Sequence, residues 1–203
     1  MTKICVAVDI EKPGCKMMRN PIASIGFVVG SGNKILEKQR FNVKINWDSE
    51  MNGGDVEQRC YDEFWSKVPR HIIDDCIKDA EEPTVIWPKI NDWINSLEIK
   101  YPSPEYNICF LTDNASFDIA SIDYALEKYC DRMPMRYTTS NKYRAVISAD
   151  DMLDMVDDNS KNIIYEKIKQ DVVSDHNPVN DAHAIYLQYY YAMQYSNKLD
   201  MFN

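Results

Sequence analysis

A long apolar run is missing from this sequence of 203 residues. A membrane-spanning helix needs roughly 20 consecutive apolar residues, and no stretch approaches that length. The first residues, from Met1 to Asp9, have the pattern of a strand and lack the longer apolar core and the small-residue cleavage site of a secretory signal. We therefore expect a soluble, cytoplasmic protein with no membrane partner.

Cysteine pairs with metal-binding spacing are missing as well. None of the six cysteines stands in a Cys-x-x-Cys pair, and none is grouped closely with a histidine. Cys5 and Cys109 fall inside predicted strands, where a cysteine behaves as a small buried apolar residue. Free thiols are therefore expected, and a zinc site or a disulfide framework is not.

Positive charge is scarce. Lys and Arg number 23 against 32 Asp and Glu, which gives a net charge of −9. Proteins that coat nucleic acid are usually basic, so this balance argues against that class. It does not exclude an enzyme that contacts nucleic acid locally, because metal-binding carboxylates are acidic and the bound ions reverse the local field. Basic residues gather at 34–44 and 128–144, where solvated surface is the ordinary explanation.

Apolar patterning predicts the order of strands and helices. The length and the absence of repeats indicate one domain over residues 1–203. Strands are expected at 3–9, 23–30, 34–45, 106–111 and 143–147, and helices at 115–129 and 180–198. This order predicts an α/β fold with a mixed five-stranded sheet, in which a three-strand antiparallel meander and two parallel strands are flanked by helices. In such sheets, ligands bind near strand ends.

Acidic residues follow two of these strands. Asp9 and Glu11 stand two apart at the end of the first strand, so their side chains point to the same side. Asp118 comes four residues after Asn114, near the start of the helix that follows the fourth strand. Structural explanations exist for each, because strand ends often carry acids, the helix dipole favours an acid in the first turn, and Asn114 suits an N-cap.

A histidine and an aspartate open the last helix, in the run Asp175-His176-Asn177-Pro178-Val179-Asn180-Asp181-Ala182. The structural alternative is that this run only caps the helix and that His176 is a surface loop residue. Together, the motifs supply four carboxylates and one histidine. Two-metal phosphodiester hydrolysis requires such a set, because two divalent ions need acidic ligands and the attacking water needs a base. The five motif residues are Asp9, Glu11, Asp118, His176 and Asp181.

The order Asp-x-Glu, Asn-x-x-Phe-Asp and His-x4-Asp resembles the DEDDh family of 3′–5′ exonucleases, which has the ribonuclease H-like fold. The resemblance covers nearly the whole chain. Ser24-Ile25-Gly26-Phe27-Val28 matches the second strand of the family, and the run around His176 is the most specific match.

The resemblance implies a role for each motif residue. Asp9 would bridge two Mg²⁺ or Mn²⁺ ions, Glu11 and Asp181 would complete the site of the first ion, and Asp118 would hold the second. His176 would take the proton from the attacking water. The implied reaction is metal-dependent hydrolysis at the 3′ end of single-stranded DNA or RNA, which releases nucleoside 5′-monophosphates. A homodimer is compatible with the resemblance, because small stand-alone relatives often dimerise.

Substrate contacts are expected from Ile10, Asn114, Tyr61 and Trp65. Tyr61 and Trp65 share one predicted helix with Phe64, and bases stack on aromatic rings at about 1–3 kcal/mol each. The alternative is that this aromatic stripe packs into the core, as on any amphipathic helix.

Three features depart from the family pattern. The segment that begins Lys12-Pro13-Gly14 lacks the threonine common in relatives, where this loop lines the terminal nucleotide. Asp113 stands where many relatives have a histidine, and the acidic loop at 150–159 is an addition. Of the remaining histidines, His183 is expected to be structural and His71 gives no functional signal.

Two other functions use the same features. A catalytically silent nucleic-acid or protein-binding module needs no complete metal set, so the five motif residues argue against it. A ribonuclease H-like endonuclease is disfavoured by the spacing of His176. The many Asn, Ile, Lys and Tyr residues would suit a phage or viral protein in its host cell. The sequence thus predicts a 3′–5′ exonuclease and leaves the sugar preference open.

Overall fold

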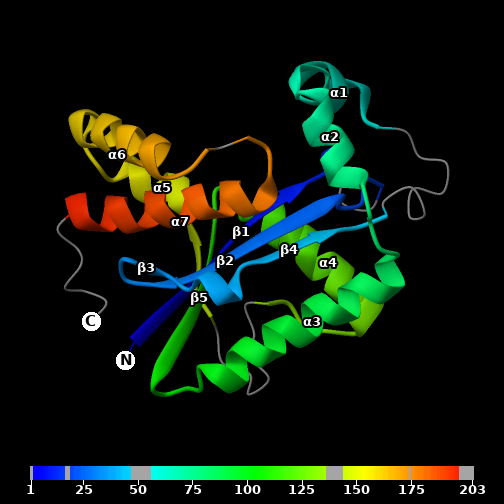
Figure 1. Ribbon diagram of the computed structural model, residues 1–203. Coiled ribbons are helices and arrows are strands. Elements are labelled where there is room, and N and C mark those ends of the chain that lie inside the picture. Colours follow the sequence, from blue (N-terminus) through cyan, green and yellow to red (C-terminus); the bar gives the residue numbers. More distant parts are fainter. Residues whose placement is uncertain (1, 17–18, 47–55, 136–143, 174, 197–203) are drawn as a thin grey trace.

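A mixed β-sheet forms the centre of the computed structural model, which describes residues 2–16, 19–46, 56–135, 144–173 and 175–196 (Figure 1). The strands are β1 (Thr2–Glu11), β2 (Ser24–Ser31), β3 (Lys34–Ile35), β4 (Phe41–Lys44), β5 (Tyr106–Thr112) and β6 (Val146–Ser148). Their order is β3-β2-β1-β5-β6, and β4 also pairs with β2. β1 is antiparallel to β2 and parallel to β5, and β5 is parallel to β6. The predicted mixed sheet is confirmed.

The third expected strand is interrupted. β3 ends at Ile35, a short 3₁₀ helix η1 (Glu37–Gln39) follows, and β4 begins at Phe41. The Leu36 N–H donates to the Val29 carbonyl (2.8 Å), and the Leu36 carbonyl then accepts from the Gln39 N–H (2.7 Å), which turns the chain out of the ladder. The described sheet therefore has six strands instead of five. The fifth expected strand begins at 143, and residues 136–143 lie outside the described residues.

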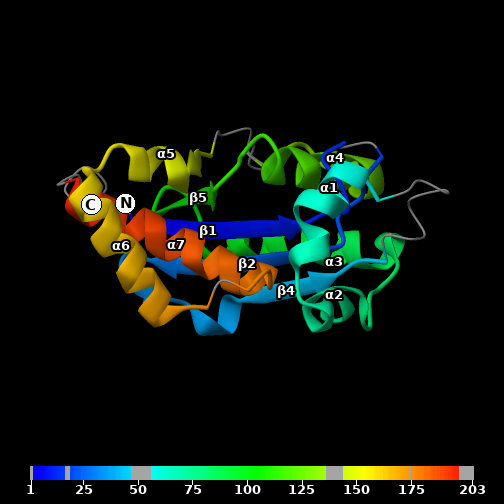
Figure 2. The same cartoon turned by 90° about the horizontal axis from the view of Figure 1, so that it is seen from above.

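Helices cover both faces of the sheet (Figure 2). One face carries α3 (Pro83–Lys100) and α4 (Asp118–Cys130), and α7 (Pro178–Tyr195) lies across the other. The shorter helices are α1 (Gln58–Glu63), the 3₁₀ helix η2 (Trp65–Lys67), α2 (Arg70–Ile77), α5 (Ala149–Asp154) and α6 (Asp158–Asp171). α3 continues through Pro88. Among the described helices, none is long and apolar enough to cross a membrane.

Strand β1 alternates between two cores, because successive side chains of a strand point to opposite faces. Val6 and Val8 pack into the larger core with α3 and α4. Cys5 and Ala7 belong to the second core, where α7 packs on the sheet. The small side chains on this second face let the backbone of α7 lie close to β1 and β2. The ring of Tyr186 of α7 packs directly on Gly30, where a Cβ would clash with it.

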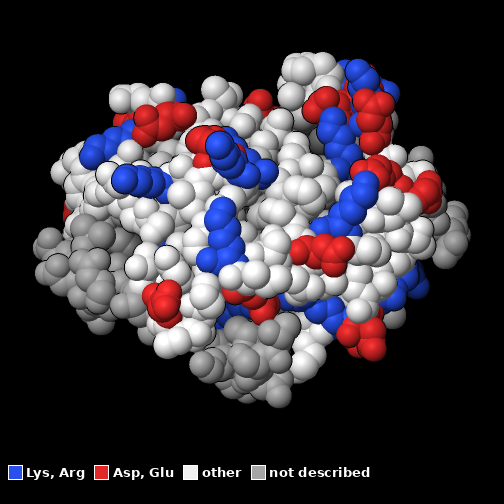
Figure 3. All heavy atoms as spheres, turned by 60° about the horizontal axis from the view of Figure 1, so that its bottom comes forward, with Lys and Arg blue, Asp and Glu red and all other residues white. Residues whose placement is uncertain are grey.

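Charges on the surface are mixed. Figure 3 shows one face, on which Lys and Arg side chains are interspersed with Asp and Glu rather than gathered into one basic surface. On this face, therefore, neither sign of charge dominates.

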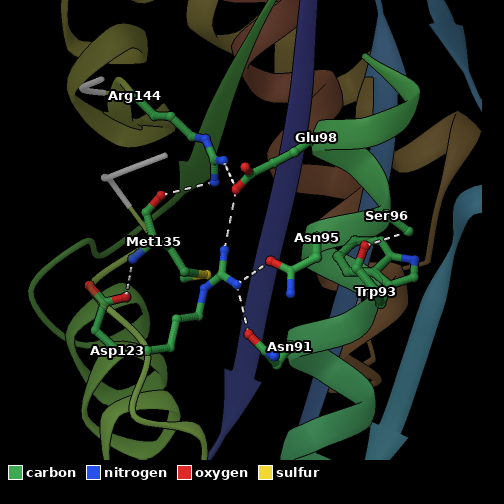
Figure 4. A network of polar contacts seen from close by, with 9 residues as sticks. Asn91, Trp93, Asn95, Ser96, Glu98, Asp123, Met135 and Arg144 are labelled. Carbon is green, nitrogen blue, oxygen red and sulfur yellow. Dashed lines mark hydrogen bonds and ion pairs between the residues drawn. The ribbon is translucent and has the colours of Figure 1, made fainter. Parts of the chain in front are cut away.

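Arg132 and Arg144, expected on the surface, instead form a polar network around Glu98 of α3 (Figure 4). Arg144 is only 5% exposed; it pairs with Glu98 and donates to the Met135 carbonyl at 3.1 Å. Arg132, just after α4, donates to Asn91 of α3 at 2.7 Å and lies 3.4 Å from Glu98. One carboxylate thus joins α3 to the segments that follow α4 and precede β6.

Replacing Glu98 by Ala is expected to destabilise the protein by about 3–5 kcal/mol, because it leaves the buried Arg144 and the partly buried Arg132 without their shared carboxylate. Urea unfolding followed by circular dichroism measures the change. Glu127→Ala is the matched control, since Glu127 is exposed on α4 and its loss should change the stability by less than about 0.5 kcal/mol. Equal stabilities of the two variants would show that the network does not hold these segments together.

Candidate active site

Strand β1 delivers two carboxylates to one end of the sheet. Because Ala7 faces α7, the alternation of the strand places Asp9 and Glu11 on that same face. In the β1–β2 ladder, Asp9 pairs with Gly26 and Glu11 pairs with Ser24. Glu11 is only 7% exposed, so its carboxylate belongs to the interior of the site rather than to a solvated strand end.

The start of α7 lies directly over this end of β1 and β2, because Gly26 leaves room for it. A Cβ built on Gly26 would lie 2.1 Å from the carbonyl carbon of Pro178 and 2.2 Å from the nitrogen of Val179. This close approach brings His176 and Asp181, the two residues predicted from the last motif, to β1. Ligand atoms of Glu11, His176 and Asp181 all lie within 4.8 Å of one another.

Side chains of Asp175 and Asn177, which the sequence identified as possible helix caps, form the hydrogen bonds of the turn before α7. Asn177 Oδ1 accepts from the Val179 N–H at 3.2 Å. Asp175 Oδ1 accepts from the Asn177 N–H at 3.3 Å and from the Asn180 side chain at 3.1 Å. His176 adopts a left-handed backbone with φ of 60°. For a residue other than glycine this conformation costs about 1–3 kcal/mol and persists only where its surroundings enforce it.

Asp118 reaches the site from the other side of β1. β5, the parallel neighbour of β1, ends at Thr112, and α4 begins at Asp118. The Thr112 hydroxyl donates to Asp118 Oδ2 and accepts from the Asn114 N–H at 3.1 Å. Asn114 shapes this loop as well, since its carbonyl accepts from the Asp118 N–H at 2.9 Å and its Oδ1 accepts from Ser116 Oγ at 2.7 Å.

These elements line one cleft of about 500 Å³. It is bordered by all five motif residues and by the expected Ile10 and Asn114. The side chain of Ile10 belongs to the core with α3 and α4. The other lining residues are Lys12, Cys60, Phe64, Asp113, Phe117, Asp150, Ala184, Ile185 and Gln188. Three motifs far apart in the sequence therefore meet in one place. Asp150 also borders the cleft, and it lies in α5 rather than in the acidic loop expected at 150–159.

Burial and mutual repulsion raise the pKa values of the carboxylates in the cleft. Burial, and then repulsion from Asp181 and Asp118, raises the pKa of Glu11 to about 8. Burial raises the pKa of Asp118 to about 8 despite the hydrogen bond from Thr112. Burial and the charge of Glu11 raise the pKa of Asp9 well above its usual value. Clustered buried carboxylates favour cation binding, because a bound cation relieves their repulsion.

The donor set fits hard divalent cations. Asp9, Glu11, Asp118 and Asp181 offer carboxylate oxygens, which Mg²⁺ and Mn²⁺ prefer and which suit zinc less well than sulfur or imidazole. Among the described lining residues, Cys60 adds a thiol, but its Sγ lies 3.9 Å from the Lys12 carbonyl, and burial raises the pKa of this thiol.

Two aromatic residues border the cleft, Phe64 and Phe117, and neither is one of the two expected there. Trp65 is buried, and its Nε1 donates to the Lys12 carbonyl at 3.0 Å, so its ring supports the end of β1. Tyr61 is half-exposed and does not border the cleft. Phe64 borders it and meets the His176 ring edge to face, with centroids 4.7 Å apart. Helical spacing grouped these rings but could not tell which one faces the site.

Lys12 is a cleft residue that motif reasoning left without a role. It is 4% exposed, its Nζ donates to Ser121 Oγ at 3.0 Å, and it lies 5.3 Å from the centre of the Phe117 ring. Burial lowers the pKa of Lys12 to about 8. The only signal in the sequence was its place at the start of the segment that departs from the family pattern.

His183 lies outside the cleft. Its Nδ1 is 3.2 Å from a guanidinium nitrogen of Arg40. Burial and the charge of Arg40 lower the pKa of His183. These contacts agree with a structural part for this histidine.

Replacing Glu11 by Gln is expected to stabilise the metal-free protein by at least about 1 kcal/mol at pH 8, the equivalent of about one pKa unit. A carboxyl whose pKa is raised by folding stabilises the folded state below its unfolded pKa, and this stability is lost as the pH rises toward the folded pKa of about 8. The advantage of the variant should therefore shrink from pH 8 to pH 5. Thermal unfolding of the wild type and the variant in EDTA, at pH 8 and at pH 5, measures the stability difference and its change with pH. A wild-type protein that loses stability when the pH is lowered from 8 to 5 would contradict the expectation.

One protein family matches most of the chain. A family model described as the 3′-5′ exoribonuclease Rv2179c-like domain matches residues 5–191. No curated protein sequence matches the chain.

Solved structures show the same fold. The nuclease domain of 3′hExo, a DEDDh family member bound to rAMP, has a TM-score of 0.61 at 15% identity, over 97% of this chain and 94% of that one. E. coli exonuclease I in complex with a dT13 oligonucleotide has a TM-score of 0.66 at 11% identity, over 98% of this chain and 43% of that one. This chain thus spans less than half of exonuclease I. The ribonuclease H-like fold expected from the sequence is confirmed.

Proposed function

The chain belongs to the Rv2179c-like family of 3′-5′ exoribonuclease domains and is a 3′–5′ exonuclease, and from this premise we propose that it removes nucleoside 5′-monophosphates from the 3′ ends of single-stranded RNA or DNA. The observation that carries the proposal is the convergence of four carboxylates and one histidine on a single cleft. The family description favours RNA as the first substrate to test. We take residues 1–203 as one exonuclease domain, of which the family model covers 5–191.

Asp9, Glu11, Asp118 and Asp181 are proposed to hold two divalent cations, Mg²⁺ or Mn²⁺. Bound there, such ions stabilise negative charge on the entering and leaving oxygens of a phosphodiester and make water a better nucleophile. The residues around these carboxylates hold them in position. Thr112 orients the Asp118 carboxylate through its hydroxyl, and the rigid end of β1 fixes Asp9 and Glu11 on the face below α7.

His176 is proposed to accept the proton of the attacking water at an imidazole nitrogen. It borders the cleft beside Glu11 and Asp181, as a general base must. Phe64 packs edge to face against its ring and limits the ring's rotation. Substrate contacts are proposed for the residues that open into the cleft, namely Asn114, Lys12 and Phe64.

The purified protein, incubated with 5′-labelled single-stranded RNA and DNA in Mg²⁺ or Mn²⁺, tests the proposal. A ladder that shortens from the 3′ end supports it, and the faster strand gives the sugar preference. Cleavage of a circular strand would instead indicate an endonuclease. Binding of both strands with no cleavage, at any metal concentration, would leave a catalytically silent binding module as the function.

A further inference from the structure

His176 borders a second, much smaller cavity of about 20 Å³. Its other walls are Ser24 of β2, Asn42 and Lys44 of β4, Ile72 and Asp75 of α2, and Asn177 and Pro178 at the start of α7. Lys44 Nζ pairs with Asp75 Oδ1 at 3.1 Å, so α2 is tied across β4 where the cavity closes. Among the described lining residues, His176 alone borders both this cavity and the catalytic cleft.

The hydroxyl of Ser24 is the unusual feature of this cavity. Ser24 is fully buried, and its Oγ has no hydrogen-bond partner among the described residues. Ser24 pairs with Glu11 across the ladder and stands two residues before Gly26, so it shares their face below the start of α7. A buried hydroxyl without a partner costs about 1–3 kcal/mol, and such groups are normally bonded to the protein or to ordered water.

The cavity suits one water molecule. A water needs at least about 10–15 Å³ and two to four polar partners. The cavity is of this size, and its polar lining residues are Ser24, Asn42, His176 and Asn177, beside the Lys44–Asp75 ion pair. An apolar ligand does not fit such a lining, and a larger polar one does not fit the volume.

The His176 ring, for its part, lacks a fixed partner. Among the described residues, no protein group forms a hydrogen bond with its imidazole, and its ring contact is Phe64. A general base has to present one nitrogen to the substrate water, and the hydrogen bond at the other nitrogen decides which one carries the proton. The strained backbone of His176, with φ of 60°, shows that its surroundings enforce its position.

We propose that Ser24 is a positioning residue for His176, and that one water in the small cavity joins Ser24 Oγ to a ring nitrogen of His176. The other ring nitrogen then faces the cleft unprotonated. This inference rests on the proposed function, since it assigns the group that orients the proposed base. It also explains why a serine lies at this buried strand position, where an apolar side chain would otherwise pack.

Ser24→Ala is expected to lower kcat about tenfold while KM changes less than about twofold, the size of effect seen when partners that orient site residues are removed. Ser24→Thr, which keeps the hydroxyl, should recover most of the loss. Ser24→Cys, which keeps the volume but bonds weakly, should resemble Ser24→Ala. Ser31→Ala is the matched control, because it removes a hydroxyl from the other end of β2, where Ser31 Oγ donates to the Lys3 carbonyl at 3.0 Å. Its kcat should not change.

The second readout needs no turnover. Long-range proton–nitrogen NMR at pH 8 reports which ring nitrogen of each of the three histidines is protonated. The His176 signal should show one tautomer in the wild type and in Ser24→Thr, and a mixture in Ser24→Ala and Ser24→Cys. An unchanged tautomer, or an unchanged kcat in a folded Ser24→Ala protein, overturns the proposal. If the wild type cleaves nothing, the proposed function fails, and the NMR arm still decides the Ser24 contact.

Discussion

The His176→Ala variant is expected to lose about 10²–10⁴-fold in exonuclease turnover, the range for removal of a general acid or base. The reason is geometric, since His176 borders the cleft within 4.8 Å of ligand atoms of Glu11 and Asp181. The four carboxylates remain in this variant, so Mg²⁺ or Mn²⁺ should still raise its melting temperature. End-labelled RNA cleavage and thermal unfolding, each with and without metal, measure the two effects.

Two further variants separate the base from the metal ligands. Asp181→Asn should lose turnover and also most of the stabilisation by metal, because it removes a charged donor from the same group. His183→Ala should keep both, because His183 packs against Arg40 outside the cleft. Full turnover in His176→Ala would exclude it as the base. Loss of metal stabilisation in that variant would make it a ligand instead.

The Gly26→Ala variant is expected to lose about 10²-fold in turnover, as a displacement of about 1 Å at a catalytic group does. The added Cβ would lie 2.1 Å from the carbonyl carbon of Pro178, and backbone atoms at that distance must move apart. The start of α7 would shift away from β2, and His176 and Asp181 would shift with it. Single-turnover cleavage at saturating metal measures the loss.

Gly32→Ala is the matched control for this effect. Gly32 has φ of 58° and no atom within 4 Å of a built Cβ, so alanine there strains the β2–β3 turn while its methyl group contacts no part of α7. The Gly32 carbonyl, which accepts from the Tyr186 hydroxyl of α7 at 2.8 Å, is kept in this variant. It should lower the stability by about 1 kcal/mol and leave turnover unchanged. If Gly26→Ala loses stability but no turnover, the approach of α7 to β2 serves packing and not the site.

Local patterns were enough to predict the sheet and the motifs. The apolar run before Asp9 specified a strand buried on both faces, and the spacing of Asp9 and Glu11 put both carboxylates on one side of it, because strand geometry has a period of two. The order of strands and helices then restricted the fold to a mixed sheet with covered faces. The third strand was predicted without its interruption at η1, since hydrogen bonds of Leu36 decide that bend.

The same patterns could not assign side chains whose position depends on packing between distant segments. Trp65 and Phe64 are neighbours on the chain, yet Trp65 supports the Lys12 carbonyl and Phe64 meets His176. Arg132 and Arg144 were predicted to be surface charges, but in the structure both pair with Glu98 of α3. Helical spacing and local charge are equally compatible with burial or exposure in each case.

The sequence by itself therefore specified the family and the residues proposed to carry the chemistry, because the residue types, their order and their spacing depend on the chain alone. Only the tertiary structure decided the fit of α7 on β2 at Gly26 and the enclosure of Ser24 beside His176. It also decided the burial and the repulsion that together raise the pKa of Glu11 to about 8. These features depend on distances between segments far apart in the sequence, and such distances exist only once α7, near the end of the chain, has packed on β1 and β2 near its beginning.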